Sequence, residues 1–140
     1  LRGYPQWVSF KITNLGPDTL VVRNSVLPWG KWYKYPNKGI DGSSPGGVTI
    51  ASGATSPTPP FAACGRENSP SGTEGTFDLY AKEIKVATIY FDCPYIGSNK
   101  LSVQYACNTC VVQLPSFSTS GPLGDLVIKV VALVNLEAEA

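Results

Sequence analysis

The apolar residues of this chain occur in short runs separated by glycine and proline, and this pattern constrains the fold more than any other feature. The chain has 14 glycines and 12 prolines among 140 residues, which is well above average usage. The runs are rich in Val, Ile, Thr, Tyr and Phe, which favour extended strands. We therefore predict an all-β protein with many turns.

Short strands can be placed between the turn residues, and no segment reads convincingly as a helix. The segment 125–135 has helical length, but its β-branched residues favour a central strand. Residues 36–47, 52–60 and 65–75 are predicted loops, and 136–140 a frayed tail. The expected strands cover residues 6–13, 20–23, 29–35, 48–51, 61–64, 75–80, 84–93, 100–107, 110–114 and 125–135.

These elements predict an antiparallel two-sheet β-sandwich that forms a single domain over residues 1–140. The run 20–23 should return antiparallel to 6–13, because a turn cluster separates them. On an alternating strand over 29–35, Trp29, Tyr33 and Tyr35 share one face, and Trp32 lies on the other. The two residues Asn108 and Thr109, between two strands, predict a hairpin.

Charge and residue usage exclude several classes of function. The chain has 11 Lys and Arg, 10 Asp and Glu, a net charge of +1 and no His. Balanced charges give no field for holding nucleic acid. Without His there is no Ser-His-Asp or Cys-His arrangement and no His-ligated metal. We expect no nucleic-acid partner, no metal and no cofactor.

The four cysteines allow three disulfide pairings. Cys107 and Cys110 flank the predicted turn, and a disulfide that closes this hairpin is the favoured interpretation. A thioredoxin-type site lacks the expected βαβ surroundings, and a four-cysteine zinc site needs a second close pair. Cys64 and Cys93 are expected to be buried thiols at strand ends, or a pair.

Catalysis without His would depend mainly on carboxylates. Asp78 and Asp92 lie in apolar strand surroundings, where a raised pKa could suit the acid of a glycosidase. It is far commoner for such carboxylates to accept hydrogen bonds from loop backbone. We therefore predict that the protein is not an enzyme.

Aromatic residues gather in three groups, and one of them is at a predicted loop tip. Tyr95 follows Pro94 beside the polar segment Gly97–Lys100. An aromatic ring beside a lysine suits a bilayer interface, where the ring lies at headgroup depth and the lysine meets phosphate. The same residues could stack on sugars, so a secreted carbohydrate-binding module is the alternative.

Five segments of the chain form a recognisable ordered set: Gln6–Val8, Trp29–Lys31, Cys64–Arg66, Gly72–Leu79 and Phe91–Tyr95. Together they resemble aegerolysins, in which such segments occur in the same order, and the resemblance extends from about residue 4 to residue 134. It implies a compact β-sandwich that binds sphingolipid headgroups, often with sterol, or ceramide phosphoethanolamine. It also implies a larger partner, since many members dock on the lipid while a perforin-like protein inserts as a pore.

The chain also differs from typical members. Fungal lipid-binding aegerolysins have Trp-Asp-Cys-Pro-Trp where this chain has Phe91–Tyr95. Ser71 aligns with a functional acid of sphingolipid-sensing members, although Glu67 and Glu74 are nearby. The residues 90–92 and 97–100 are also similar to the small component of bacterial binary insecticidal proteins, which work with an unrelated larger partner.

The resemblance implies a secreted protein that acts peripherally on a target membrane, although no signal peptide is visible. Lys31 and Lys100 would meet phosphate, and Glu67 or Glu74 would meet an ethanolamine or choline amine. The aromatic residues that would insert at headgroup depth are Trp29, Trp32, Tyr33 and Tyr95. The low net charge favours recognition of a zwitterionic headgroup over electrostatic attraction to anionic lipids. The chain alone is not expected to lyse membranes. The predicted lipid-binding residues are Trp29, Lys31, Trp32, Tyr33, Glu67, Glu74, Phe91, Tyr95 and Lys100.

Overall fold

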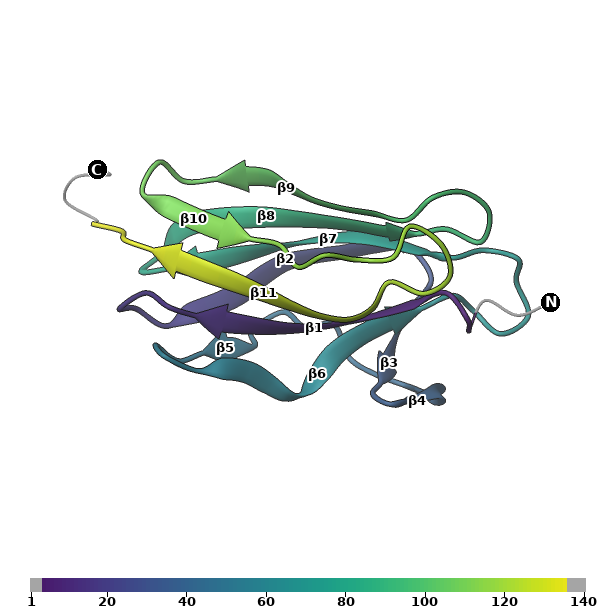
Figure 1. Cartoon of the computed structure of the whole chain (residues 1–140). Coiled ribbons are helices and arrows are strands. Elements are labelled where there is room, and N and C mark those ends of the chain that lie inside the picture. Colours follow the sequence, from purple (N-terminus) through teal and green to yellow (C-terminus); the bar gives the residue numbers. More distant parts are fainter. Residues whose placement is uncertain (1–3, 136–140) are drawn as a thin grey trace.

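Every regular element in the computed structural model, which describes residues 4–135, is a β-strand (Figure 1). The strands form two sheets packed face to face, so the predicted all-β sandwich is confirmed. The predicted tail 136–140 lies outside the described residues. The strands are β1 (Trp7–Asn14), β2 (Leu20–Trp29), β3 (Lys31–Lys34), β4 (Asn37–Asp41), β5 (Thr49–Ile50), β6 (Thr55–Cys64), β7 (Thr73–Ala81), β8 (Ile84–Cys93), β9 (Lys100–Ala106), β10 (Cys110–Gln113) and β11 (Gly124–Ala132).

The strands that are neighbours in each sheet are often far apart along the chain. The six-stranded sheet has the order β10-β11-β1-β6-β3-β4, and the five-stranded sheet has the order β5-β2-β7-β8-β9. All the pairs are antiparallel except β1 with β11, which run parallel from Val8 opposite Gly124 to Asn14 opposite Val130. The sandwich is therefore not purely antiparallel, because the first and last strands of the described chain lie side by side.

The predicted antiparallel return of residues 20–23 onto 6–13 is wrong. β1 pairs with β6 and β11, whereas β2 pairs with β5 and β7 in the other sheet. The buried side chain of Asn14 fixes this crossing, since its amide donates to the Asp18 carbonyl at 2.7 Å and the Ile50 carbonyl at 3.0 Å. A turn that crosses between layers uses the same residue types as a hairpin turn.

The predicted strand 29–35 is interrupted at Gly30. This residue has a φ of +91°, and a Cβ there would lie 2.5 Å from the Cys64 carbonyl oxygen. The chain therefore passes from β2 in one sheet to β3 in the other at a point where only glycine fits. As a result Trp29 is 58% exposed and Tyr33 only 4% exposed, so they do not share a face as predicted.

Two predicted loops contain strands, and one predicted hairpin is absent. Residues 37–41 form the edge strand β4, and 55–60 form the first half of β6, whose pairing with β1 shifts between Phe10 and Ile12. β9 and β10 belong to different sheets, so residues 107–110 cross between layers. The disulfide between Cys107 and Cys110 is formed at this crossing, and Cys64 and Cys93 are buried free thiols.

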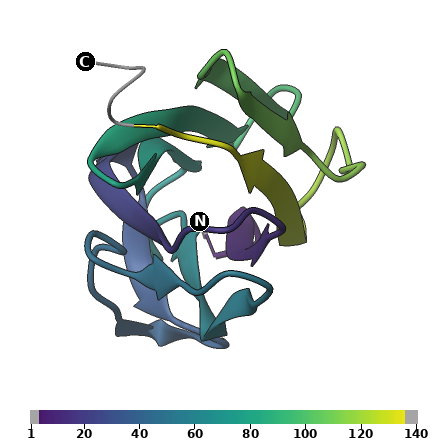
Figure 2. The same ribbon diagram turned by 90° about the vertical axis from the view of Figure 1, so that its left-hand side faces the viewer.

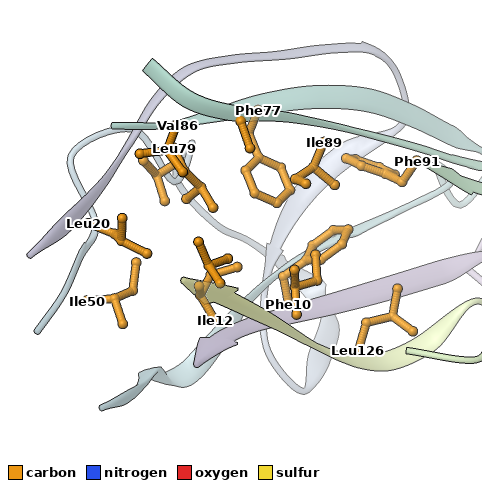
Figure 3. Packing of buried hydrophobic residues seen from close by; sticks show 14 of the residues in the cluster. Phe10, Ile12, Leu20, Ile50, Phe77, Leu79, Val86, Ile89, Phe91 and Leu126 are labelled. Carbon is orange, nitrogen blue, oxygen red and sulfur yellow. The ribbon is translucent and has the colours of Figure 1, made fainter. Parts of the chain in front are cut away.

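The core lies between the two layers and has an aromatic centre. Phe10 of β1 contacts Phe61, Phe77 and Phe91, with ring centroids 5.1–5.4 Å apart. Figure 3 shows Phe10 from one sheet meeting Phe77 and Phe91 from the other in the interior. The end-on view in Figure 2 shows the two layers curving around this core. Burial of large apolar side chains from both sheets holds the layers together.

One end of the sandwich gathers the segments that matter for function. β2 and β8 end there, β7 and β9 begin there, and the loops 65–72 and 94–99 extend beyond them (Figure 1, right). Among residues 4–135, the chain forms no helix that is long and apolar enough to cross a membrane. Any site at this end of the sandwich is built on the ends of the four paired strands β2, β7, β8 and β9.

Candidate functional site

A row of four residues crosses the outer face of the five-stranded sheet at this end. Trp29 of β2 lies opposite Glu74 of β7, Glu74 lies opposite Asp92 of β8, and Asp92 lies opposite Lys100 of β9. Directly opposed side chains point to the same face, with Cβ atoms roughly 5 Å apart. The sheet thus places an aromatic ring, two carboxylates and an ammonium in sequence.

Beside this row is a pocket of about 380 Å³, which the loops 65–72 and 94–99 help to enclose. Trp29 and Ile96, which are 58% and 86% exposed, stand at its rim with the half-buried Tyr95. Glu74, Asp92 and the hydroxyl residues Ser71 and Thr73 also line the pocket. Its chemistry is therefore acidic and hydroxyl-rich inside, and apolar at the rim.

Close backbone packing holds the start of β7 against its neighbours. A Cβ at Gly72 would lie 2.0 Å from the Cys93 carbonyl oxygen, so only glycine allows this approach. The Thr73 hydroxyl donates to the Trp29 carbonyl at 3.1 Å, and the hydroxyls of Ser69 and Ser71 are 2.8 Å apart. These contacts fix Trp29 and the loop relative to the two carboxylates.

The two carboxylates influence each other because they are cross-strand neighbours. Burial is the main cause that raises the pKa of Asp92, the Glu74 charge adds to it, and Lys100 opposes it. The Tyr90 hydroxyl donates a hydrogen bond to Glu74, and burial followed by this bond raises the pKa of Tyr90. The pocket is thus a concentration of negative charge that an ammonium group would relieve.

Three of the predicted lipid-binding residues line this pocket, and a fourth stands beside it. Trp29, Glu74 and Tyr95 contribute to its lining. Lys100 completes the cross-strand row next to Asp92.

Three other predicted residues belong to the core or its margin. Phe91 is 0% exposed, so it cannot contact lipid as predicted, and Tyr33 is 4% exposed, so it cannot insert at headgroup depth as predicted. Trp32 packs against Phe61 and Phe91, with ring centroids 6.2 and 6.3 Å apart. Alternation points the side chains of Phe91 and Trp32 into the layer interior. Tyr33 lies on the other face of the six-stranded sheet, where it is buried in a smaller cluster with Ala62 and Cys64.

Lys31 and Glu67 lie in a second pocket, also of about 380 Å³, on the other side of the loop 65–72. Tyr4, Asp41 and Arg66 line it as well. The prediction placed Lys31 and Glu67 in one site with Trp29 and Glu74, but the structure assigns them to a different hollow.

Asp78 does not resemble a catalytic acid, because side chains already satisfy its carboxylate. Thr88 donates to it at 2.6 Å and Asn24 at 2.9 Å, and the Lys85 ammonium is 3.7 Å away. The expected partners were loop backbone groups, whereas the observed ones are side chains of the same sheet face and of β2. Among the described residues, no three His, Cys, Asp or Glu side chains are grouped closely enough to hold a metal.

Sequence reasoning did not place Asp92, Thr73 or Ile96 at this site, although all three line the pocket. Alternation along each strand places Glu74 with Thr76, and Asp92 with Tyr90, on one face. The faces of these side chains could therefore be predicted from the sequence. The register that sets Glu74 directly opposite Asp92 could not be predicted, because it depends on a bulge at residues 79–80 as well as on the turn.

Comparison with known proteins agrees with this architecture. The sequence profile described as Aegerolysin matches residues 5–133. The chain is 35% identical over 101 residues to Asp-hemolysin of Aspergillus fumigatus, covering 68% of each chain. It is 36% identical over 104 residues to Aegerolysin Aa-Pri1 of Cyclocybe aegerita, covering 71% of this chain and 69% of the relative. The crystal structure of RahU protein in complex with a TRIS molecule superposes with a TM-score of 0.84 at 28% identity, covering 94% of this chain and 98% of RahU. The chain belongs to the aegerolysin family.

Proposed function

We propose that this protein is a non-enzymatic membrane-lipid-binding protein whose pocket at the end of the five-stranded sheet receives an ammonium-bearing headgroup. The supporting observation is the row of Trp29, Glu74, Asp92 and Lys100 beside a pocket with an apolar rim. Membership of a family that includes Asp-hemolysin supports an action on membranes.

The carboxylates would hold the amine. Glu74 and Asp92 carry two negative charges on adjacent strands, and a cation between them removes their mutual repulsion. Lys100 is one strand further, about 4.8 Å away by ordinary strand spacing. That spacing is comparable to the separation of ammonium and phosphate in an ethanolamine or choline headgroup, so Lys100 would meet the phosphate.

The rim would sit at the bilayer interface. Trp29 and Ile96 are exposed apolar side chains, and Tyr95 has an aromatic body with a polar tip. Tryptophan and tyrosine prefer the headgroup level of a membrane. The headgroup would thus enter the pocket while the rim contacts the acyl boundary.

The proposed target is a zwitterionic sphingolipid or ceramide phosphoethanolamine, with or without sterol, on the outer surface of a target membrane. A net charge of +1 supports a zwitterionic headgroup, since it gives little general attraction to anionic surfaces. The protein would act extracellularly as the docking component for a larger pore-forming partner. On this proposal the pure chain releases no dye from liposomes.

The test is sedimentation with liposomes of defined composition: phosphatidylcholine alone, and with sphingomyelin, ceramide phosphoethanolamine or phosphatidylethanolamine, each with and without sterol. Binding to at least one of the added lipids is expected. Trp29→Ala should weaken that binding at least about tenfold, which corresponds to about 1.4 kcal/mol. Tyr105→Ala, an exposed aromatic on the same sheet but outside the pocket, is the matched control.

The carboxylate role is tested in the same assay. Glu74→Gln should weaken binding, whereas Glu83→Gln, in the β7–β8 turn at the far end of the sheet, should not. Absence of binding to every lipid of the panel would refute the proposal. Saturable competition by free sugars would instead favour a carbohydrate-binding module built on the same aromatics.

A further inference from the structure

The second pocket, on the other side of the loop 65–72, is called the groove below. Its charge arrangement differs from that of the pocket beside Trp29 and Glu74. Lys31 of β3, Asp41 of β4 and Arg66 of the loop line the groove. The same three residues also line an adjoining hollow that extends toward Gly30 and Trp32. The groove therefore continues past the two cations.

Lys31 is held in place by its neighbours. Its side chain is only 14% exposed, and its ammonium lies 5.1 Å from the centre of the Tyr4 ring. The ammonium donates to the Asp41 carboxylate at 2.9 Å and to the Tyr4 hydroxyl at 3.4 Å. The charge is therefore positioned at low conformational cost before any ligand arrives.

Asp41, unlike Lys31, is exposed to solvent. Its side chain is 82% exposed, and it reaches Lys31 from the solvent side. Lys31, and after it Arg66, hold the pKa of Asp41 below its ordinary value, so the carboxylate is ionised close to both cations. An exposed carboxylate of this kind contributes little to stability, and an incoming anion could displace it.

We propose that this groove is an anion site that takes a phosphate group, and that Asp41 occupies the anion's position when no ligand is bound. A phosphate offers more acceptor oxygens than a carboxylate, and arginine binds it with two parallel hydrogen bonds. Asn68 and Ser69 line the same groove and add side-chain donors. Glu67 is also present, so the affinity for free phosphate is expected to be weak.

The groove and the proposed lipid pocket lie next to each other, because successive residues of one loop line them. Residues 66–69 line the groove and residues 70–74 line the pocket, with the hydroxyls of Ser69 and Ser71 in contact between them. A membrane surface that presents ammonium and phosphate groups together would match both hollows. The phosphate site itself does not depend on the proposed function, since it can be occupied by a soluble ligand.

The first experiment is a titration of the whole protein with inorganic phosphate, followed by backbone amide NMR. Amide shifts should concentrate at residues 31, 41 and 66–69. Arg66→Gln should weaken the phosphate affinity at least fivefold, and Asp41→Asn should strengthen it at least twofold by removing the competing carboxylate. Arg23→Gln is the control, because it removes the same charge from an exposed arginine of β2 outside the groove.

Three results would each overturn the proposal. They are the absence of localised amide shifts, a loss of phosphate affinity in Arg23→Gln equal to that in Arg66→Gln, and weaker phosphate binding in Asp41→Asn. Vesicles of phosphatidylcholine with and without phosphatidic acid identify the source of the phosphate. Tighter binding with phosphatidic acid that Arg66→Gln abolishes supports a lipid phosphate, and shifts with soluble phosphate alone support a soluble ligand. Glu74→Gln should retain the phosphate shifts, so failure of the amine pocket and failure of this groove give different results.

Discussion

At the scale of single residues, the proposed pocket is built at a cost to stability. Asp92 is partly buried beside Glu74, and both effects disfavour its ionised form. Lys100 offsets only part of this effect. A strained pair of charges is a common property of binding and catalytic sites, because the ligand supplies the compensation that the fold does not.

Asp92→Asn should therefore stabilise the protein at neutral pH while weakening lipid binding. The native pKa of Asp92 is raised above its ordinary value of 3.8, so the native state binds this proton more tightly than the unfolded state does. Stability then falls as pH rises from about 4 through the native pKa, and the deficit is complete above it. An amide has no such titration.

Thermal unfolding of both proteins between pH 3 and pH 7 measures this effect. The Tm of Asp92→Asn should exceed that of the native protein at pH 7, and the two should converge near pH 3, where Asp92 is neutral. A variant Tm at pH 7 equal to or below the native value would contradict the destabilising role of the ionised carboxylate.

At the scale of the elements, the connections between strands were harder to predict than the strands themselves. Period-two alternation identified β1, β7 and β8 because their apolar residues face the core. It could not show that Gly16-Pro17, Gly30 and residues 107–110 carry the chain between sheets, since hairpins and layer crossings use the same turn residues. The break at Gly30 explains why Tyr33 does not share a face with Trp29, whereas the burial of Phe91 follows from alternation along β8.

Gly30→Ala should be markedly more destabilising than Gly47→Ala. Both glycines have a φ of +91°, so an alanine suffers the same backbone strain at either position. A Cβ at position 30 would also meet the Cys64 carbonyl at 2.5 Å, whereas a Cβ at position 47 has nothing within 4 Å. We expect a loss of about 1 kcal/mol at position 47 and at least about 3 kcal/mol at position 30.

Urea denaturation of the two variants provides the comparison, and their difference isolates the steric contact from the φ preference. Lipid binding by Gly30→Ala should fall as well, because Trp29 precedes the altered residue. Equal losses of stability in the two variants would show that the close approach of β2 and β6 at Gly30 is not needed.

At the scale of the whole molecule, the proposed binding pocket and the disulfide lie at opposite ends of the sandwich. The pocket is at the beginning of β7 and β9, whereas Cys107 follows the end of β9 (Figure 1). Composition and alternation were enough to predict the two-layer architecture, since it depends on how many apolar faces must be buried. The order of strands in each sheet was not predictable, because it depends on contacts far apart in the chain.

Replacing both Cys107 and Cys110 by serine should lower the free energy of unfolding by roughly 2 kcal/mol, which is the value for so short a closed loop. Lipid binding at temperatures well below the transition should be unchanged, because the pocket is remote. Calorimetry and liposome sedimentation on the same sample give both quantities. Loss of binding in a folded double variant would show that the two ends are coupled.

The parallel pairing of β1 with β11 also has a consequence for biosynthesis. β1 leaves the ribosome before β2–β11, but β11, one of its two neighbours, is made more than a hundred residues later. Until then one edge of β1 has unpaired backbone groups, and such edges promote aggregation. The six-stranded sheet cannot be completed until β11 has left the ribosome, so the nascent chain must protect this edge of β1 until then.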